Sequence, residues 1–461
     1  MSARRFALLA AALTLFAPAG LRAQTGLRDL LTNFLQEGIT LAPPASGVSH
    51  VAHFNSLDSL QFISIRQFNQ ELANQLSSFP LASSAGGFTY RFDPALGVFT
   101  RATDSFGPIY ADRADTIGKG KFNLGLNYSH FDFDRINELS LGDGDLRLVF
   151  THADVNHDGS NLHRYVEGDV ITGQLFLKIK TDITAFVLTY GVSNRFDIGM
   201  AIPVVHVDLS ARTDATIQRL ATGPTDNPPT IHRFPSGGST ATFQDSGNAS
   251  GVGDIVLRGK FRVVGGAAGG LALGADVRLP TGEERDLLGT GATQARVSLS
   301  GSLNLGNFAP HINGGYTKSA KPQDDRTPEE KNPPNGGTPL PRLSIPDAID
   351  YTAGFDWAVH PRVTVALDVL GRTFRQTQIV RVVKTNFQAN TNKNEYPETI
   401  VAYTFPRLTS TKGNSNTLLG SFGLKVNPFA NLLVTGNVLF SLRREGLQTR
   451  IAPLVGVDYS F

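Results

Sequence analysis

Apolar and polar residues alternate with a period of two along most of the chain after residue 119. In KFNLGLNYSHF (121–131), every second residue from Phe122 to Tyr128 is apolar, and the residues between them are polar or glycine. The same alternation recurs in QARVSLSGSLNL (294–305) and RVTVALDVL (362–370). Side chains on a strand point alternately to opposite faces, so this pattern predicts β-strands with one apolar face.

Twelve segments carry this pattern. They lie near residues 121–133, 169–190, 196–212, 253–264, 270–281, 292–305, 309–318, 347–359, 362–375, 416–426, 432–442 and 450–461. The second segment is long and its pattern changes near Thr181-Asp182, where we expect a kink or a split into two strands.

The connections between these segments sort by length. Short turns fall at 191–195, 265–269, 306–309, 360–362 and 427–431, long polar stretches at 134–168, 213–252, 319–346 and 376–415, and intermediate ones at 282–291 and 443–449. Short turns at one end and long loops at the other, on amphipathic strands of about ten residues, are typical of outer-membrane barrels. We therefore predict an all-β fold, a transmembrane antiparallel β-barrel of about twelve strands with both chain ends on the periplasmic, short-turn side.

The C-terminal segment LVGVDYSF (454–461) fits the last strand of such a barrel. Its apolar face would contact lipid, with Tyr459 and Phe461 in the periplasmic aromatic girdle, and the strand would pair with the first one. The spacing of Gly456, Tyr459 and Phe461 resembles the C-terminal signal read by the barrel-assembly machinery, which we expect as a partner during biogenesis. Leu454 departs from the polar residue that is usual two positions before that glycine.

The N-terminus predicts export. Residues 1–23 have a basic start at Arg4 and Arg5, an apolar run over 6–17 and a cleavage site at Leu21-Arg22-Ala23, as in a Sec-type signal peptide. No later run of about 18 apolar residues occurs, so no helix is expected to span a membrane.

Residues 24–115 differ from the barrel that we place at 116–461. Apolar residues at helical spacing predict helices over 27–39 and about 56–78, and 88–102 reads as a hairpin. This segment could fold into the lumen as a plug, form a periplasmic cap, or attach the protein to a membrane or partner. Twelve strands leave room for a narrow pore or a modest inserted segment, because about eight strands give a filled interior and about 16 a channel. If the hairpin joins the wall, the barrel has fourteen strands.

If the apolar face points outward, charged residues of the other face line the lumen. These candidates are Lys178, Lys180, Arg258, Lys260, Arg262, Asp276, Arg278, Arg296, Asp350, Asp356 and Asp368. They could form a charged pathway with a cationic ladder, Arg258-Lys260-Arg262, that favours anionic or polar solutes. Alternatively, they pair across the lumen and fill a narrow barrel.

The composition and motifs leave little room for catalysis or cofactors. Lys plus Arg number 42 and Asp plus Glu 40, so the net charge of +2 gives no argument for nucleic acid, and the absence of cysteine excludes disulfides and thiolate sites. Asp154, Asn156 and Asp158 have the spacing of calcium ligands, but the twelfth loop position is Tyr165 instead of an acid, and Asx turns explain the same residues. The histidines form no Ser/His/acid constellation. We expect no enzyme and, apart from that calcium alternative, no cofactor.

Four phrases carry a family resemblance. SSAGGFTYRFD (83–93), SFGPIYADRA (105–114), DTIGKGKFNLGLNY (115–128) and YGVSNRFDIGMAIPVVHVDL (190–209) resemble the phenol meta-pathway-degradation-like outer-membrane transporter family. The resemblance implies a β-barrel with a transport role, with aromatic or hydrophobic compounds as the implied solutes. It identifies no residues that would bind a substrate.

From barrel, export signal and resemblance together, we expect a monomeric outer-membrane channel of a Gram-negative-type bacterium that moves small solutes passively, with lipid and solute as partners. The alternative is a non-conducting barrel with a structural or surface-binding role through its long extracellular loops.

Overall fold

The structure is a computed structural model. It describes residues 26–34, 39–43, 54, 60–76, 80, 87–93, 98–152, 168–220, 232–322, 324, 328–332, 344–392 and 397–461. The predicted signal peptide lies outside the described residues. Among the described helices, none is both long and apolar enough to cross a membrane.

The predicted fold class is confirmed, because twelve antiparallel strands close into a barrel. In spatial order the wall consists of β3 (Phe122–Ile136), β6 (Val170–Gly191), β7 (Phe196–Gln218), β9 (Val256–Gly266), β10 (Gly269–Arg278), β11 (Gln294–Leu303), β12 (Phe308–Ser319), β13 (Ala348–His360), β14 (Val363–Asn390), β15 (Ile400–Val426), β16 (Leu432–Ser441) and β18 (Ala452–Ser460). Strand β18 pairs with β3 and closes the ring. The hairpin of β1 (Tyr90–Asp93) and β2 (Val98–Arg101) forms a separate sheet, so the fourteen-strand alternative is wrong.

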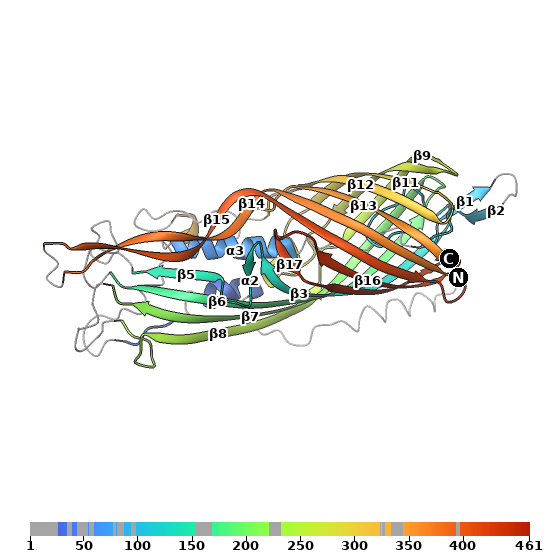
Figure 1. The fold of residues 1–461 in the computed structure, drawn as a ribbon. Helices are drawn as coiled ribbons and strands as arrows, with labels where there is room; N and C mark the ends of the chain where they lie inside the picture. Colours follow the sequence, from blue (N-terminus) through green and yellow to red (C-terminus); the bar gives the residue numbers. More distant parts are fainter. Residues whose placement is uncertain are drawn as a thin grey trace, which may run out of the picture.

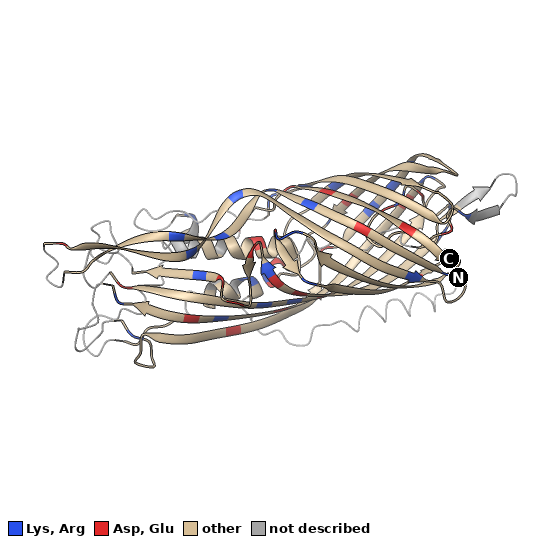
Figure 2. Cartoon of the chain, in the orientation of Figure 1, with Lys and Arg blue, Asp and Glu red and all other residues tan. Residues whose placement is uncertain are grey.

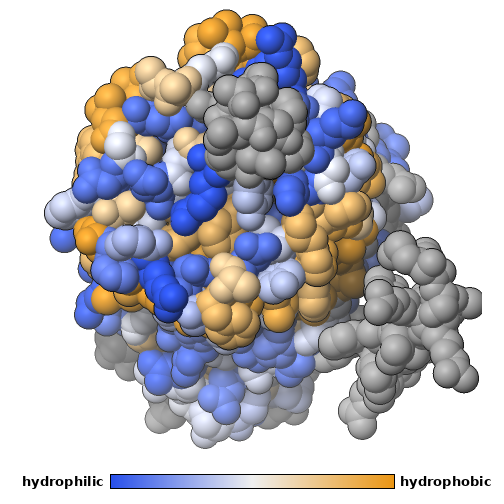
Figure 3. Space-filling model, turned by 90° about the vertical axis from the view of Figure 1, so that its right-hand side faces the viewer, coloured by the Kyte–Doolittle hydropathy of each residue, from blue (hydrophilic) through white to orange (hydrophobic). Residues whose placement is uncertain are grey.

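The C-terminal strand has the predicted orientation. Val455, Val457, Tyr459 and Phe461 are exposed on the outer wall, and the residues between them are buried. The N–H of Phe461 donates to the carbonyl of Phe122 at 2.8 Å, so the chain end is held by the first wall strand. Figure 3, which views the end where the chain terminates, shows patches of hydrophobic residues around the outside. Apolar residues on the outside of a closed barrel are what a lipid environment requires.

Several stretches predicted as loops contain strands. The long hairpin β14–β15 pairs from Val363↔Val426 to Asn390↔Ile400, with one shift of register between Phe374 and Thr377. Most of the predicted loop 376–415 is therefore wall and projecting arm. Strand β8 (Thr240–Val252) pairs with β7, β5 (Leu146–Thr151) with β6, and β4 (Leu139–Ser140) and β17 (Leu447–Thr449) with β3. A short 3-10 helix, η4 (Glu284–Asp286), and α4 (Pro328–Lys331) lie in the remaining loops.

The change of pattern near Thr181-Asp182 is not a split into two strands, because β6 is continuous over 22 residues. It marks a row of cross-strand partners, Tyr128, Thr184 and Val204, at which the apolar face of the wall changes sides. On the short-turn side of this row, apolar side chains such as Phe186 point outward and are exposed. On the long-loop side, the buried apolar side chains are those of the inner face, listed for three strands as Phe131, Phe133, Leu177, Ile179, Val207 and Leu209.

Two helices account for this inversion. Helices α2 (Leu27–Asn33) and α3 (Leu60–Leu76) lie at the long-loop end of the molecule, away from the C-terminus (Figure 1). Their apolar residues, among them Leu31, Phe68 and Leu72, form one core with the inner faces of the wall strands. On the long-loop side of the row, the interior of the barrel is therefore an apolar core, and the outer face of the wall meets water.

Candidate functional site inside the barrel

Residues 103–117, called the inner belt here, follow the inside of the wall at the short-turn end. Four backbone N–H groups of the belt donate to wall side chains: Phe106 to Thr364 Oγ1 (3.0 Å), Asp112 to Asn313 Oδ1 (2.7 Å), Ala114 to Ser302 Oγ (3.1 Å) and Ile117 to Asp197 Oδ2 (3.0 Å). The acceptors belong to β14, β12, β11 and β7, so the belt passes the wall strands in order. Buried backbone groups need such partners, and the wall supplies them.

Two lysines of the wall bind carbonyl oxygens of the belt. Lys425 Nζ donates to the carbonyl of Pro108 at 2.7 Å, and Lys260 Nζ donates to that of Asp115 at 2.8 Å. Both lysines are buried, which is favourable for an ammonium group only when acceptors surround it. Their charge therefore holds the inserted segment.

An ion pair fixes the centre of the belt. The guanidinium of Arg113 is fully buried, pairs with Asp356 on β13, and donates from Nη1 to Thr103 Oγ1 at 2.6 Å. His311 lies between two carboxylates, with Nδ1 at 3.4 Å from Asp356 Oδ1 and Nε2 at 2.6 Å from Asp368 Oδ1. These groups connect the belt to three adjacent strands, β12, β13 and β14.

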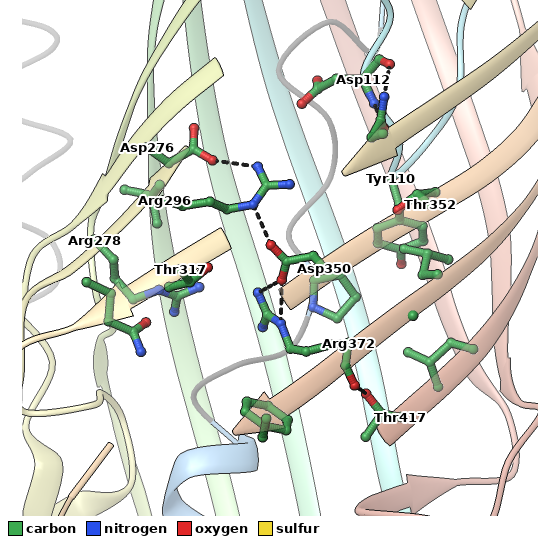
Figure 4. A pocket seen from close by; sticks show the side chains of 18 of the residues that line it. Tyr110, Asp112, Asp276, Arg278, Arg296, Thr317, Asp350, Thr352, Arg372 and Thr417 are labelled. Atoms are coloured by element: carbon green, nitrogen blue, oxygen red, sulfur yellow. Dashed lines mark hydrogen bonds and ion pairs between the residues drawn. The ribbon is translucent and has the colours of Figure 1, made fainter. Parts of the chain in front are cut away.

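Between the inner belt and the helical core lies a cavity of about 200 Å³. Its lining includes four arginines and three aspartates, which are Arg258, Arg278, Arg296, Arg372, Asp112, Asp276 and Asp350. Arg296 bridges Asp276 (3.0 Å) and Asp350 (2.6 Å), and Arg372 pairs with Asp350 at 2.7 Å, as the dashed lines in Figure 4 show. These charged groups thus form a chain of ion pairs that extends from β10 to β14.

Helix α3 closes the cavity on the long-loop side. Gln75 lines the cavity, and its side-chain carbonyl accepts a hydrogen bond from the N–H of Leu447. Glu71, one turn earlier, is buried and accepts hydrogen bonds from Thr377 and Gln75. Burial raises the pKa of Glu71, because a desolvated carboxylate is unfavourable, although the hydrogen bonds act in the opposite direction.

The predicted lumen candidates fall into three places. Five of them line the cavity: Arg258, Asp276, Arg278, Arg296 and Asp350. Four lie against or beside the belt: Lys260, Arg262, Asp356 and Asp368, with Arg262 Nη1 at 3.5 Å from Asp115 Oδ1.

The remaining two candidates, Lys178 and Lys180, were wrongly assigned to the lumen. They alternate with the buried Leu177 and Ile179, so they point outward, and Lys180 Nζ lies 3.7 Å from Asp132 Oδ2. The assignment failed because it took the apolar face of β6 to be the outer one along the whole strand. On the long-loop side, the helical core makes the inner face of the strand the apolar one.

Sequence reasoning missed Arg372, Arg113 and Tyr110. Arg372 lies on the polar face of the predicted strand 362–375, so the alternation could have revealed it. Arg113 and Tyr110 lie in the belt, where no periodic signal exists. The calcium candidates Asp154, Asn156 and Asp158 lie outside the described residues. Within the described residues, no group of three or more His, Cys, Asp or Glu side chains is placed to hold a metal ion.

A family model described as MetA-pathway of phenol degradation matches residues 160–377. The predicted family resemblance is confirmed. Of the four phrases that carried it, only 190–209 lies within the matched range, and the other three precede it.

The chain is also similar to solved structures of outer-membrane proteins. An outer membrane channel from Pseudomonas putida F1 has 12% sequence identity and a TM-score of 0.39, and the match covers 76% of this chain and 98% of that one. A FadL homologue from Pseudomonas aeruginosa has 12% identity and a TM-score of 0.32, with 82% and 96% of the chains covered. No curated protein matches the chain.

Proposed function

We propose that this protein is an outer-membrane channel that moves small solutes passively and is gated by its N-terminal segment, without catalysis or a cofactor. The observation that supports this function best is the cavity. It lies inside a closed barrel, is lined by charged side chains, and is bounded by the inner belt on one side and by α3 on the other. A packed structural barrel has no need of such a space.

The belt is the element whose movement would open the path. It is buried in the lumen at the short-turn end and is joined to the wall by hydrogen bonds, by the ion pairs Arg113–Asp356 and Arg262–Asp115, and by apolar contacts such as that of Ile109 with Ala366 and Leu454. Polar contacts of this kind can exchange with water when a segment shifts. In this proposal the belt acts as a plug, and export by the predicted signal peptide delivers a monomer to the outer membrane of a Gram-negative-type bacterium.

Planar-bilayer recordings of the full-length chain test this function. In a KCl gradient, we expect brief openings whose reversal potential shifts toward cations in Arg258→Glu, because this residue lines the cavity. The matched control Lys178→Glu changes the same charge on the outside of the wall and should leave the reversal potential unchanged. If correctly folded protein passes no ions under any condition, the channel function is wrong.

A surface-binding role is the second candidate, and the projecting β14–β15 hairpin favours it. Within its described residues 377–392 and 397–413, the basic residues are Arg381, Lys384, Arg407 and Lys412, and Glu398 is the one acidic residue. Figure 2 shows basic residues along this arm. Absence of ion flux, combined with binding of the protein to dextran sulfate that is lost in Arg381→Gln/Lys384→Gln, would favour this role.

A further inference from the structure

The inner belt is packed differently on its two sides. Toward β14, β16 and β18 its contacts are apolar, because Ile109 packs with Ala366 and Leu454, and Phe106 packs with Leu433. Separating these side chains from the wall would expose apolar surface to water, which is unfavourable. This side of the belt therefore resists separation from the wall.

Toward β6, β7, β9, β10 and β11, the belt and the wall enclose a second, small cavity of about 20 Å³. A cavity of about 10–15 Å³ or more holds a water molecule when polar groups surround it, so this one has room for water. Its lining combines charged side chains with small residues. The charged ones are Asp112, Asp197, Arg258, Lys260 and Asp276, and the small ones include Thr189, Gly199, Gly274, Ser298 and Ser300.

A buried carboxylate in this lining lacks a partner that water can supply. Asp197 Oδ2 accepts a hydrogen bond from the N–H of Ile117 at 3.0 Å, whereas Asp197 Oδ1 has no hydrogen-bond partner among the described residues. Buried polar atoms are nearly always paired, with protein groups or with ordered water. The small cavity thus suits water, and the apolar side of the belt does not.

The small cavity continues the larger one toward the short turns. The two cavities share Asp112, Arg258 and Asp276 in their linings, and Figure 4 shows Asp112 and Asp276 together at one end of the larger cavity. Arg258 and Asp276 are cross-strand partners, and the next inward pair toward the short turns is Lys260 and Gly274. The two cavities therefore follow one line through the interior of the barrel.

Hydrogen bonds to carbonyl oxygens close this line at its far end. Lys260 Nζ donates to the carbonyl of Asp115 at 2.8 Å, and Arg262 Nη2 donates to the carbonyl of Asn194, in a short turn, at 2.7 Å. Water can replace a carbonyl group as a hydrogen-bond partner, but it cannot replace an apolar contact. The belt therefore separates from the wall more readily on this polar side.

We propose that solutes pass the inner belt on its polar side, between belt residues 112–117 and strands β7, β9, β10 and β11. This assignment rests on the proposed channel function and names the route that the channel uses. With the belt seated, the route has the width of a water molecule, and hydrated ions and small polar solutes follow when the belt moves away from this part of the wall. Ser298 and Ser300 of β11 border the route, whereas Ser421, an equally buried inward serine on β15, does not.

Thiol modification of the full-length chain during planar-bilayer recordings tests this route. The chain has no cysteine, so a reagent reacts only with an introduced thiol. In a KCl gradient, Ser298→Cys and Ser300→Cys should react during channel openings with two methanethiosulfonates. The sulfonatoethyl reagent adds a negative charge and should shift the reversal potential toward cations, and the aminoethyl reagent adds a positive charge and should shift it toward anions. The matched control Ser421→Cys should keep its current and its reversal potential with both reagents.

An unchanged current and reversal potential in both Ser298→Cys and Ser300→Cys, while the channel still opens, overturns the route. A response of Ser421→Cys equal to theirs overturns it as well, because the route would then not be confined to the polar side. If one of the two β11 variants fails to fold, the other decides. Open channels that are insensitive to the reagents leave the channel function intact and remove only the route, whereas folded protein that passes no ions under any condition removes both.

Discussion

Replacing Arg113 by methionine should open the barrel. The change leaves the carboxylate of Asp356 buried beside the belt without its guanidinium partner, and Asp356 has no exposed surface. Removing one partner of a buried ion pair costs about 3–5 kcal/mol when the other charge is left uncompensated, and this range is an upper bound here because His311 Nδ1 stays 3.4 Å from Asp356 Oδ1. The cost falls on the state in which the belt is seated, because displacement of the belt lets water reach Asp356. At about 1.4 kcal/mol per tenfold change, the ratio of displaced to seated belt should rise by at most roughly a hundredfold to four-thousandfold.

Single-channel recordings of the full-length variants in planar bilayers measure this ratio as the open fraction. The decisive control is the double variant Arg113→Met/Asp356→Leu, which removes both charges. Replacement of a buried pair by apolar residues is often neutral or stabilising, so the double variant should return close to the open fraction of the natural chain. Lys178→Met, on the outside of the wall, should have no effect.

Two results would refute this reasoning. If Arg113→Met folds, as judged by circular dichroism and by its gel shift on heating, and keeps the natural open fraction, then Arg113 does not hold the gate. If the double variant is as open as the single one, the effect comes from lost packing around Arg113 and not from the loss of the guanidinium partner of Asp356.

Three further changes have clear expected outcomes. Gly423→Val places a side chain where the belt packs and should raise the open fraction in bilayers, whereas Gly436→Val, which meets no atom within 4 Å, should not. Because burial raises the pKa of Glu71 above 4.5, the folded chain binds that proton more tightly than the unfolded one, and docking of α3 should weaken as pH rises from 4.5 through the raised value. Glu71→Gln should abolish this pH dependence of α3 docking. At pH 8, amide exchange in α3 should be slower in this variant than in the natural chain. In the cysteine-free chain, Asp132→Cys should react with a membrane-impermeant maleimide in liposomes, and Leu126→Cys should not.

The barrel wall could be predicted from sequence because its signal is local. In β11 and β18, and in β3 as far as Tyr128, alternation alone gives the strand and its outward face, since lipid imposes one rule on every residue that it contacts. The arm of β14 and β15 was missed because its Asn- and Thr-rich residues extend past the membrane, where no lipid imposes a pattern. Its pairing continues there through backbone hydrogen bonds and through apolar positions such as Val380 and Val382, which pack on the helical core.

The orientation of charged side chains could be predicted only where the surroundings were known. Lys178 and Arg258 both alternate with apolar neighbours, yet one faces water outside and the other faces the cavity. The difference lies in what fills the barrel at each level, and that filling comes from α2 and α3, more than 100 residues away in the chain. A period of two gives the two faces of a strand but not which of them is inside.

The ladder Arg258-Lys260-Arg262 illustrates why charge in a barrel interior does not by itself indicate a solute pathway. Lys260 serves the belt by binding its carbonyl oxygens, and Arg262 binds Asp115 and the carbonyl of Asn194 near a short turn. Arg258 alone of the three lines the cavity. The interior charges thus divide into those that hold the inserted segment and those that face open space, and only the second group can select a solute. Variants of Lys260 should therefore change how often the barrel opens, and variants of Arg258 should change what passes.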